Sequence, residues 1–326
     1  MIQSINFPLD TESAEAAGGW NSVKKKIADL GCDGLEGIWS GVEVPEDFPS
    51  SLLTGYHLTF FLDWLDFYHG KMEPVFQRFQ NEDNIRLAFG GLTPEDMLNT
   101  YRADLERALR FRASYVVFHV SDVTFEECYT YKWIHSDEDV IDASAEILNE
   151  LLKDTEPSFD LLVENQWWPG FRFTDPKLTD RLLSGIDYPR KGIMLDTGHL
   201  MNTNLSIKSQ ADGINYIHRM LDLHGSLSEY IKGLHFHQSV SGAYTRKHTG
   251  YLPDDYPDDY LGRFGASYGH ILHIDRHMPW TDPRCVSVVE RISPLYLTHE
   301  MSGSGSAGVF GKAGRQISTI KRGLSL

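Results

Sequence analysis

Cysteine is scarce in this sequence, and the three that occur are far apart. Cys32, Cys128 and Cys285 form no CxxC pair, which disfavours both a disulfide framework and a thiolate zinc site. The sequence also lacks an apolar run of the roughly 20 residues that a membrane helix needs. Residues 1–15 lack the basic start and apolar middle of a signal peptide. We therefore expect a cytoplasmic protein that does not associate with membranes.

Positive charge is also in short supply. Lys and Arg number 30 against 46 Asp and Glu, which gives a formal net charge of −16. This balance disfavours a broad basic surface for nucleic acid, although it leaves room for a local basic cleft. The hydrophobic content of 41% and the charged content of 23% are typical of a globular protein.

Strand and helix patterns alternate about eight times along the chain. Expected strands cover residues 3–7, 34–39, 56–62, 115–120, 161–164, 193–195, 231–237 and 295–300. Expected helices cover residues 20–30, 93–112, 137–152, 176–183, 212–223 and 283–291, and residues 63–88 are expected to form a loop across the top of the fold.

Such alternation predicts parallel strands joined by helical crossovers. The predicted fold is a single-domain α/β protein, a (β/α)8 TIM barrel over residues 1–326, with a long loop at about 238–274 over the C-terminal face. The alternative is an open doubly wound sheet with a small second domain. No GxGxxG motif follows the first expected strand, which gives a dinucleotide fold little support.

Polar residues stand at the ends of the expected strands, beginning with the segment Asp196-Thr197-Gly198-His199. A barrel places its active site at the C-terminal strand ends. The side chains expected there as metal ligands are His57, His119, Glu164, Asp196, His199, His235, Asp275, His277 and Glu300. Carboxylates and imidazoles suit zinc, manganese or iron, and a divalent cation would neutralise carboxylates that otherwise repel one another.

Strand geometry bears on two ambiguities in this set. His235 and His237 are two residues apart on an expected strand, so both point to the same side and either could be the ligand. Glu300 shares its side with Thr298, whereas His299 faces away, so Glu300 is the chosen ligand. Taken singly, His57 or His119 could be a satisfied core histidine and Asp275 a turn residue, so the prediction depends on the whole set.

The best fragments of this pattern are Phe118-His119, Val163-Glu164-Asn165, Leu195 to His199, Gly233-Leu234-His235 and Asp275-Arg276-His277. In their order along the chain they resemble the xylose isomerase-like TIM barrel superfamily. That superfamily includes sugar phosphate isomerases and epimerases and the endonuclease IV type of AP endonuclease (family 2). For the epimerases, the resemblance implies one divalent metal held by Glu164, Asp196, His235 and Glu300. For endonuclease IV, it implies three zinc ions held by the full set of expected ligands.

Two mechanisms follow, and the acidic balance favours the first. In a sugar isomerase or epimerase, a metal polarises a carbonyl, Glu164 and Glu300 are the catalytic carboxylates, and one of them removes the adjacent proton. The expected substrate contacts are His237, Arg276 and Trp168, and the expected partner is a small carbohydrate.

The alternative is a phosphodiesterase with two or three metals. The segment 302–306, with Lys312 and Arg315 beyond it, could then cradle a phosphate. The acidic residues Asp254, Asp255, Asp258 and Asp259 make a DNA partner disfavoured. A barrel that binds a metal or ligand without catalysis is a third possibility.

Overall fold

In a computed structural model that describes residues 1–303 and 305–325, eight parallel strands close into a barrel. The strands are β1 (Ile2–Pro8), β2 (Gly34–Ile38), β3 (Leu53–His57), β4 (Tyr115–His119), β5 (Asp160–Glu164), β6 (Lys191–Asp196), β7 (Ile231–His235) and β8 (Tyr296–His299). Ile5 of β1 lies opposite Leu35 of β2 on one side and His299 of β8 on the other, which closes the ring. The expected (β/α)8 TIM barrel is confirmed.

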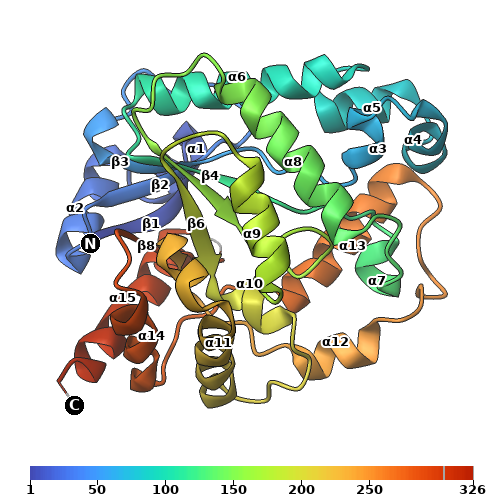
Figure 1. The fold of residues 1–326 in the computed structure, drawn as a ribbon. Coiled ribbons are helices and arrows are strands. Elements are labelled where there is room, and N and C mark those ends of the chain that lie inside the picture. The colour runs from blue at the N-terminus through green and yellow to red at the C-terminus, as the bar shows by residue number, and fades with distance from the viewer. Residues whose placement is uncertain (304, 326) are drawn as a thin grey trace.

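Helices cover the outside of the barrel (Figure 1). The outer helices are α1 (Thr11–Ala16), α2 (Trp20–Leu30), α6 (Pro94–Arg110), α8 (Asp137–Leu152), α9 (Pro176–Gly185), α11 (Gln210–His224), α14 (Val286–Ile292) and α15 (Gly305–Gly323). Capping residues set where these helices begin and end. The Thr93 amide donates to the Asp96 carboxylate at 2.9 Å at the start of α6, and Gly31 ends α2 in the left-handed conformation, with φ of 74°.

Both segments expected to be loops contain helices. Within residues 63–88 the chain forms α3 (Leu65–Tyr68), α4 (Met72–Phe79) and the start of α5 (Glu82–Phe89), and within 238–274 it forms α12 (Gly242–His248) and α13 (Tyr260–Ile274). Helix α5 begins where the Asn81 side chain accepts a hydrogen bond from the Asn84 amide at 2.9 Å. These helices gather with α7 (Glu127–Thr130) on the right of Figure 1. Four of these helices, α3, α4, α5 and α12, are only four to eight residues long, and their packing joins residues far apart in the sequence, such as Phe79 and Tyr260, so local patterns did not predict them.

The third strand also begins earlier than expected. β3 covers Leu53–His57 rather than 56–62, so His57 is its last residue. Pairing sets this limit, because His57 lies opposite both Ile38 of β2 and Val117 of β4. The chain then turns away, and the Thr59 amide donates to the Asp104 carboxylate of α6 at 2.7 Å.

A layer of large side chains fills the lower barrel. Tyr115, Val117, Leu162, Met194 and Tyr296 form a buried cluster there. A Cβ atom at Gly55 would lie 2.1 Å from the Tyr115 ring, so only glycine leaves room for this tyrosine. The residues expected as metal ligands lie beyond this layer, at the C-terminal ends of the strands.

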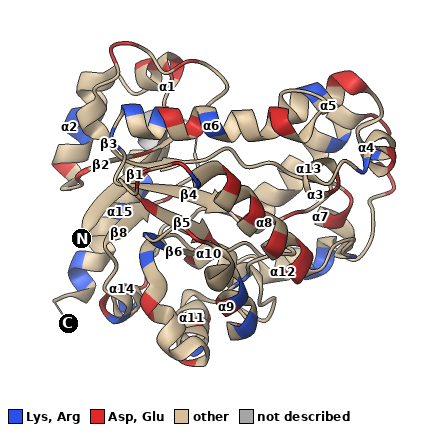
Figure 2. Cartoon of the chain, turned by 45° about the horizontal axis from the view of Figure 1, so that its top comes forward, with Lys and Arg blue, Asp and Glu red and all other residues tan. Residues whose placement is uncertain are grey.

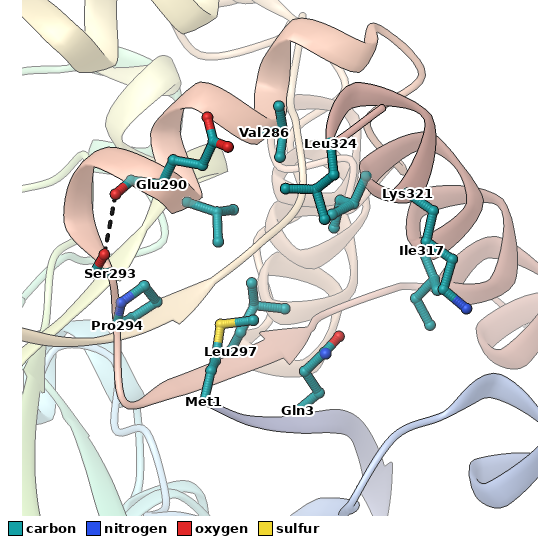
Figure 3. A pocket seen from close by; sticks show the side chains of 12 residues that line it. Met1, Gln3, Val286, Glu290, Ser293, Pro294, Leu297, Ile317, Lys321 and Leu324 are labelled. Atoms are coloured by element: carbon teal, nitrogen blue, oxygen red, sulfur yellow. Dashed lines mark hydrogen bonds between the residues drawn. The ribbon is translucent and has the colours of Figure 1, made fainter. Parts of the chain in front are cut away.

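A cavity of about 490 Å³ lies at the N-terminal end of the barrel, between the starts of β1 and β8 and the helices α14 and α15 (Figure 3). Its walls include Met1, Leu297, Ile317 and Leu324. None of the expected metal ligands lines it. No described helix has the length and hydrophobicity required to cross a membrane.

Candidate metal centre

The barrel brings every expected metal ligand to one mouth. His57, His119, Glu164, Asp196 and His235 are the last residues of their strands, β3 to β7, and Glu300 follows β8 directly. His199 lies in the first turn of α10 (Thr197–Asn202), and the segment after α13 carries Asp275 and His277. Donor atoms of these side chains form adjoining sets.

The first set consists of His57, His119 and Glu164, whose donor atoms lie within 4.8 Å of one another. Glu164 Oε2 is 3.2 Å from His57 Nε2 and 3.0 Å from His119 Nε2. Two imidazoles facing one carboxylate oxygen make a compact group of nitrogen and oxygen donors, which suits a borderline divalent cation.

The second set shares Glu164 and adds Asp196, His235 and Glu300. His235 Nδ1 lies 3.2 Å from Glu164 Oε2, 3.2 Å from Glu300 Oε2 and 3.9 Å from Asp196 Oδ2. Three carboxylates around one imidazole nitrogen would repel one another without a positive charge between them.

The third set shares Asp196 and includes His199, His237 and His277. Asp275 borders it, with Oδ2 3.2 Å from His199 Nε2 and 3.1 Å from His277 Nε2. The three sets are therefore contiguous, because Glu164 belongs to the first two and Asp196 to the last two.

Local sequence explains how the third set is built. Asp196 caps α10 by accepting a hydrogen bond from the His199 amide at 2.6 Å. A Cβ atom at Gly198 would lie 2.1 Å from the His237 ring, so the glycine lets that imidazole approach Asp196, where its Nε2 is 2.8 Å from Oδ2. His237 thus faces the other ligands, whereas the sequence left open whether it is a ligand or a substrate contact.

Burial and the charges of neighbouring residues shift the pKa values of these groups. Burial raises the pKa of Glu300 to about 8, and the neighbouring Asp196 and Glu164 carboxylates oppose its ionisation further. Burial alone would raise the pKa of Glu164, but the imidazoles of His119 and His235 hold it well below its usual range.

Unsatisfied donor atoms provide a test of whether a metal fits. Among the described residues, His235 Nδ1, His277 Nε2, Glu164 Oε1 and Glu300 Oε2 are buried without a hydrogen-bond partner. The groups that carry these atoms face neighbouring carboxylates or imidazoles at 3.0 to 3.9 Å. Buried polar atoms without partners are destabilising, and a bound cation would satisfy them, so the donor set fits a divalent metal.

One buried carboxylate of this site was not predicted from the sequence. Glu36 of β2 is fully buried beneath the second set, and His235 Nε2 lies 2.9 Å from its Oε1. Its Oε2 accepts hydrogen bonds from the Tyr115 and Thr298 hydroxyls, both at 2.8 Å. The sequence signal that could have identified Glu36 was a single acidic residue between Leu35 and Gly37 in a short strand.

The two other expected substrate contacts lie at the edge of the centre. Trp168 is buried and packs against Trp167 with ring centroids 4.2 Å apart, and Trp167 in turn packs on His199 at 5.1 Å. Arg276 is exposed, and its amide donates a hydrogen bond to the Ser239 hydroxyl at 2.9 Å. The expected phosphate cradle at 302–306 includes Ser304, which lies outside the described residues.

Comparisons with known proteins agree with this architecture. A family model described as xylose isomerase-like TIM barrel matches residues 75–286. A D-tagatose 3-epimerase-like protein is 14% identical, with 100% of this chain and 97% of that chain covered and a TM-score of 0.52. Endonuclease IV from Thermus thermophilus is 13% identical, with 100% and 99% covered and a TM-score of 0.52.

An L-ribulose 3-epimerase is 12% identical over 100% of this chain and 95% of that chain, with a TM-score of 0.54. At these identities the likeness to solved structures shows the fold alone. No curated protein sequence matches the chain.

Proposed function

Because the chain belongs to the xylose isomerase-like TIM barrel family, we propose that it is a metallohydrolase that cleaves phosphoester bonds with two or three divalent metal ions. The observation that supports this most is the contiguity of the three donor sets through Glu164 and Asp196. A centre for one ion needs only the second set and would leave the histidines of the other two sets without a role.

Each set would hold one ion through its own residues. His57, His119 and Glu164 would hold the first, and Glu164, Asp196, His235 and Glu300 the second. The third ion would be held by Asp196, His199, His237 and His277, with Asp275 beside them, since Asp275 Oδ2 lies within 3.2 Å of the His199 and His277 imidazoles. Divalent ions in such a site supply an activated water and positive charge opposite the phosphate.

The accessible side chains indicate where a substrate would approach. The side chains of His277, His119 and Glu300 are 19%, 14% and 12% exposed, whereas those of Asp196 and Glu164 are fully buried. Hydrolysis forms a bond between water oxygen and phosphorus and breaks an ester bond, and the leaving oxygen takes up a proton. The accessible ligands would therefore face the reacting phosphate, while the buried carboxylates hold the ions together.

A group of cations beside the centre supports an anionic substrate. Arg276 directly precedes His277, and the pKa of Lys312 is lowered by burial and by the positive charges of Arg315 and Arg276. None of the three forms an ion pair with another described residue. In a chain that carries a net charge of −16, three neighbouring cations of this kind suit a phosphate.

The second candidate is the sugar isomerase or epimerase that the sequence favoured. The raised pKa of Glu300, about 8, favours it, because a carboxyl group that exchanges a proton near neutral pH suits transfer next to a carbonyl. Acidic residues are also spread along the helices, including α4, α5 and α8 (Figure 2), which suits a small substrate better than duplex DNA.

Metal content and activity together distinguish the candidates. Elemental analysis of protein purified without chelators should give two or three ions per chain, with hydrolysis of bis(4-nitrophenyl) phosphate. The variant His119→Gln should lose one ion, whereas His299→Gln, a buried histidine that faces Gln3 and Gln316 instead, should not. One ion per chain with epimerisation of a ketose would favour the second candidate, and protein without metal would overturn both. An abasic-site oligonucleotide tests the DNA substrate directly.

A further inference from the structure

An apolar cleft lies beside the candidate metal centre. It has a volume of about 340 Å³, and its walls include Phe60, Phe61, Leu87, Leu261 and Phe264. All side chains that line it are apolar or aromatic, and Tyr260 alone among them carries a polar atom. Because no charged group faces the cleft, it is unsuited to a sugar or a phosphate.

Phe60 connects the cleft to the centre. Its ring forms one wall of the cleft and meets the His119 ring edge-on, with centroids 4.4 Å apart. His119 Nε2 is in turn 3.0 Å from Glu164 Oε2. Phe60 therefore contacts both the cleft and the first donor set.

The two helical segments that were expected to be loops build the cleft. The Phe79 ring of α4 packs against Tyr260 of α13 at 5.2 Å, and Gln80 accepts a hydrogen bond from the Tyr260 amide at 3.0 Å. Phe125, after β4, packs against Phe264 at 5.9 Å. Phe79 also packs against Phe89 of α5 at 5.2 Å, so α4 joins α5 to α13 and the cleft is preformed.

Its outer wall leaves large apolar side chains in water. Leu87, Leu261 and Phe264 are 68%, 59% and 44% exposed. An apolar cavity of about 150 Å³ accommodates benzene, so a cleft of about 340 Å³ has room for one to two fused rings. A ring bound there would remove these side chains from water, which favours binding.

We propose that the cleft binds the aromatic part of a small phosphoester substrate, next to the phosphate held at the metal centre. This inference rests on the proposed phosphoesterase function. Acidic residues at the start of α13, among them Asp258 and Asp259, repel a nucleic-acid backbone. The absence of charge inside the cleft and its contact with His119 through Phe60 favour a small aryl ester instead.

The test uses three diesters that share one leaving group. In methyl, phenyl and 2-naphthyl 4-nitrophenyl phosphate the same 4-nitrophenolate departs, so differences between them report on the second substituent. We expect KM to fall about tenfold or more from the methyl to the 2-naphthyl ester, with kcat changing less. The substitution Phe264→Ser should abolish this preference by raising KM for the 2-naphthyl ester toward the value for the methyl ester.

Leu272→Ser is the matched control, because Leu272 is equally exposed, at 44%, on the same helix but does not line the cleft. It should retain the preference. Calorimetric binding of 2-naphthylphosphonate against methylphosphonate gives a second measurement that is independent of turnover, and circular dichroism checks that each variant is folded.

Equal KM values for the three esters would overturn the cleft assignment while the phosphoesterase function stands. If no ester is hydrolysed, the proposed function fails and the cleft assignment fails with it. A dimer in light scattering that Phe264→Ser dissociates would assign the cleft to a second copy of this chain and overturn the proposal.

Discussion

Replacing Glu36 with glutamine tests whether the buried carboxylate beneath the centre prepares His235 to bind a metal. His235 Nε2 lies 2.9 Å from Glu36 Oε1, which directs its Nδ1 toward Glu164 and Glu300. A carboxylate that accepts the second ring N–H of a metal-binding histidine fixes the ring and makes it a better ligand.

The magnitude follows from the bonds that change. Loss of such an orienting partner lowers metal affinity by about 10–100-fold. Glutamine keeps a carbonyl oxygen for His235 but loses the charge that strengthens the hydrogen bonds from Tyr115 and Thr298. We therefore expect the lower end of the range, about tenfold, which corresponds to ~1.4 kcal/mol.

Competition with a fluorescent chelator measures this change in affinity directly. Asp160→Asn is the matched control, because Asp160 is also buried in the barrel and accepts a hydrogen bond from a tyrosine, Tyr296, at 2.7 Å. It lies at the start of β5, far from the centre, so its substitution should leave metal affinity unchanged. A folded Glu36→Gln protein that binds metal as tightly as the wild type would refute the orienting role.

Three further predictions concern catalysis, metal removal and pH. Glu164→Gln should abolish activity and leave the circular dichroism spectrum intact, because Glu164 belongs to two donor sets; measurable turnover would remove it from the mechanism. Dialysis against EDTA should lower Tm by several degrees, since a ligand at about 100 times its Kd stabilises by about 2.7 kcal/mol; an unchanged Tm contradicts a metal bound by the folded state. Burial lowers the pKa of His270 to about 4, so between pH 6.5 and 4 the unfolded chain binds a proton that the folded chain does not. The free energy of unfolding should therefore fall by up to about 3 kcal/mol as the pH is lowered through this window. Urea titrations of His270→Phe should show a free energy of unfolding that depends less on pH.

Much of the barrel was predictable because its signals are local. The apolar run from Ile193 to Leu195 followed by Asp196 indicates a buried strand with a polar end, and Thr93-Pro94 marks the start of a helix. The bounds of β3 were wrong because they depend on pairing with β2 and β4, which no local pattern reveals.

The candidate site likewise combines features with local sequence signals and features that depend on tertiary contacts. The ligands at strand ends could be proposed from the sequence, since parallel strands in a barrel present their C-terminal ends together. Glu36 and Phe60 were missed as parts of the site because their roles come from contacts with His235 and His119, far away in the sequence. The helices around the cleft depend likewise on tertiary packing, such as that of Phe79 on Tyr260.

The hydrogen bond between Glu36 and Thr298 joins residues 262 positions apart. The ribosome makes β2 well before β8, so the nascent chain cannot assemble this centre until β8 has been synthesised. Any prematurely terminated product that ends before β8 would lack Glu300 and expose an open sheet edge, which would direct it toward aggregation or degradation.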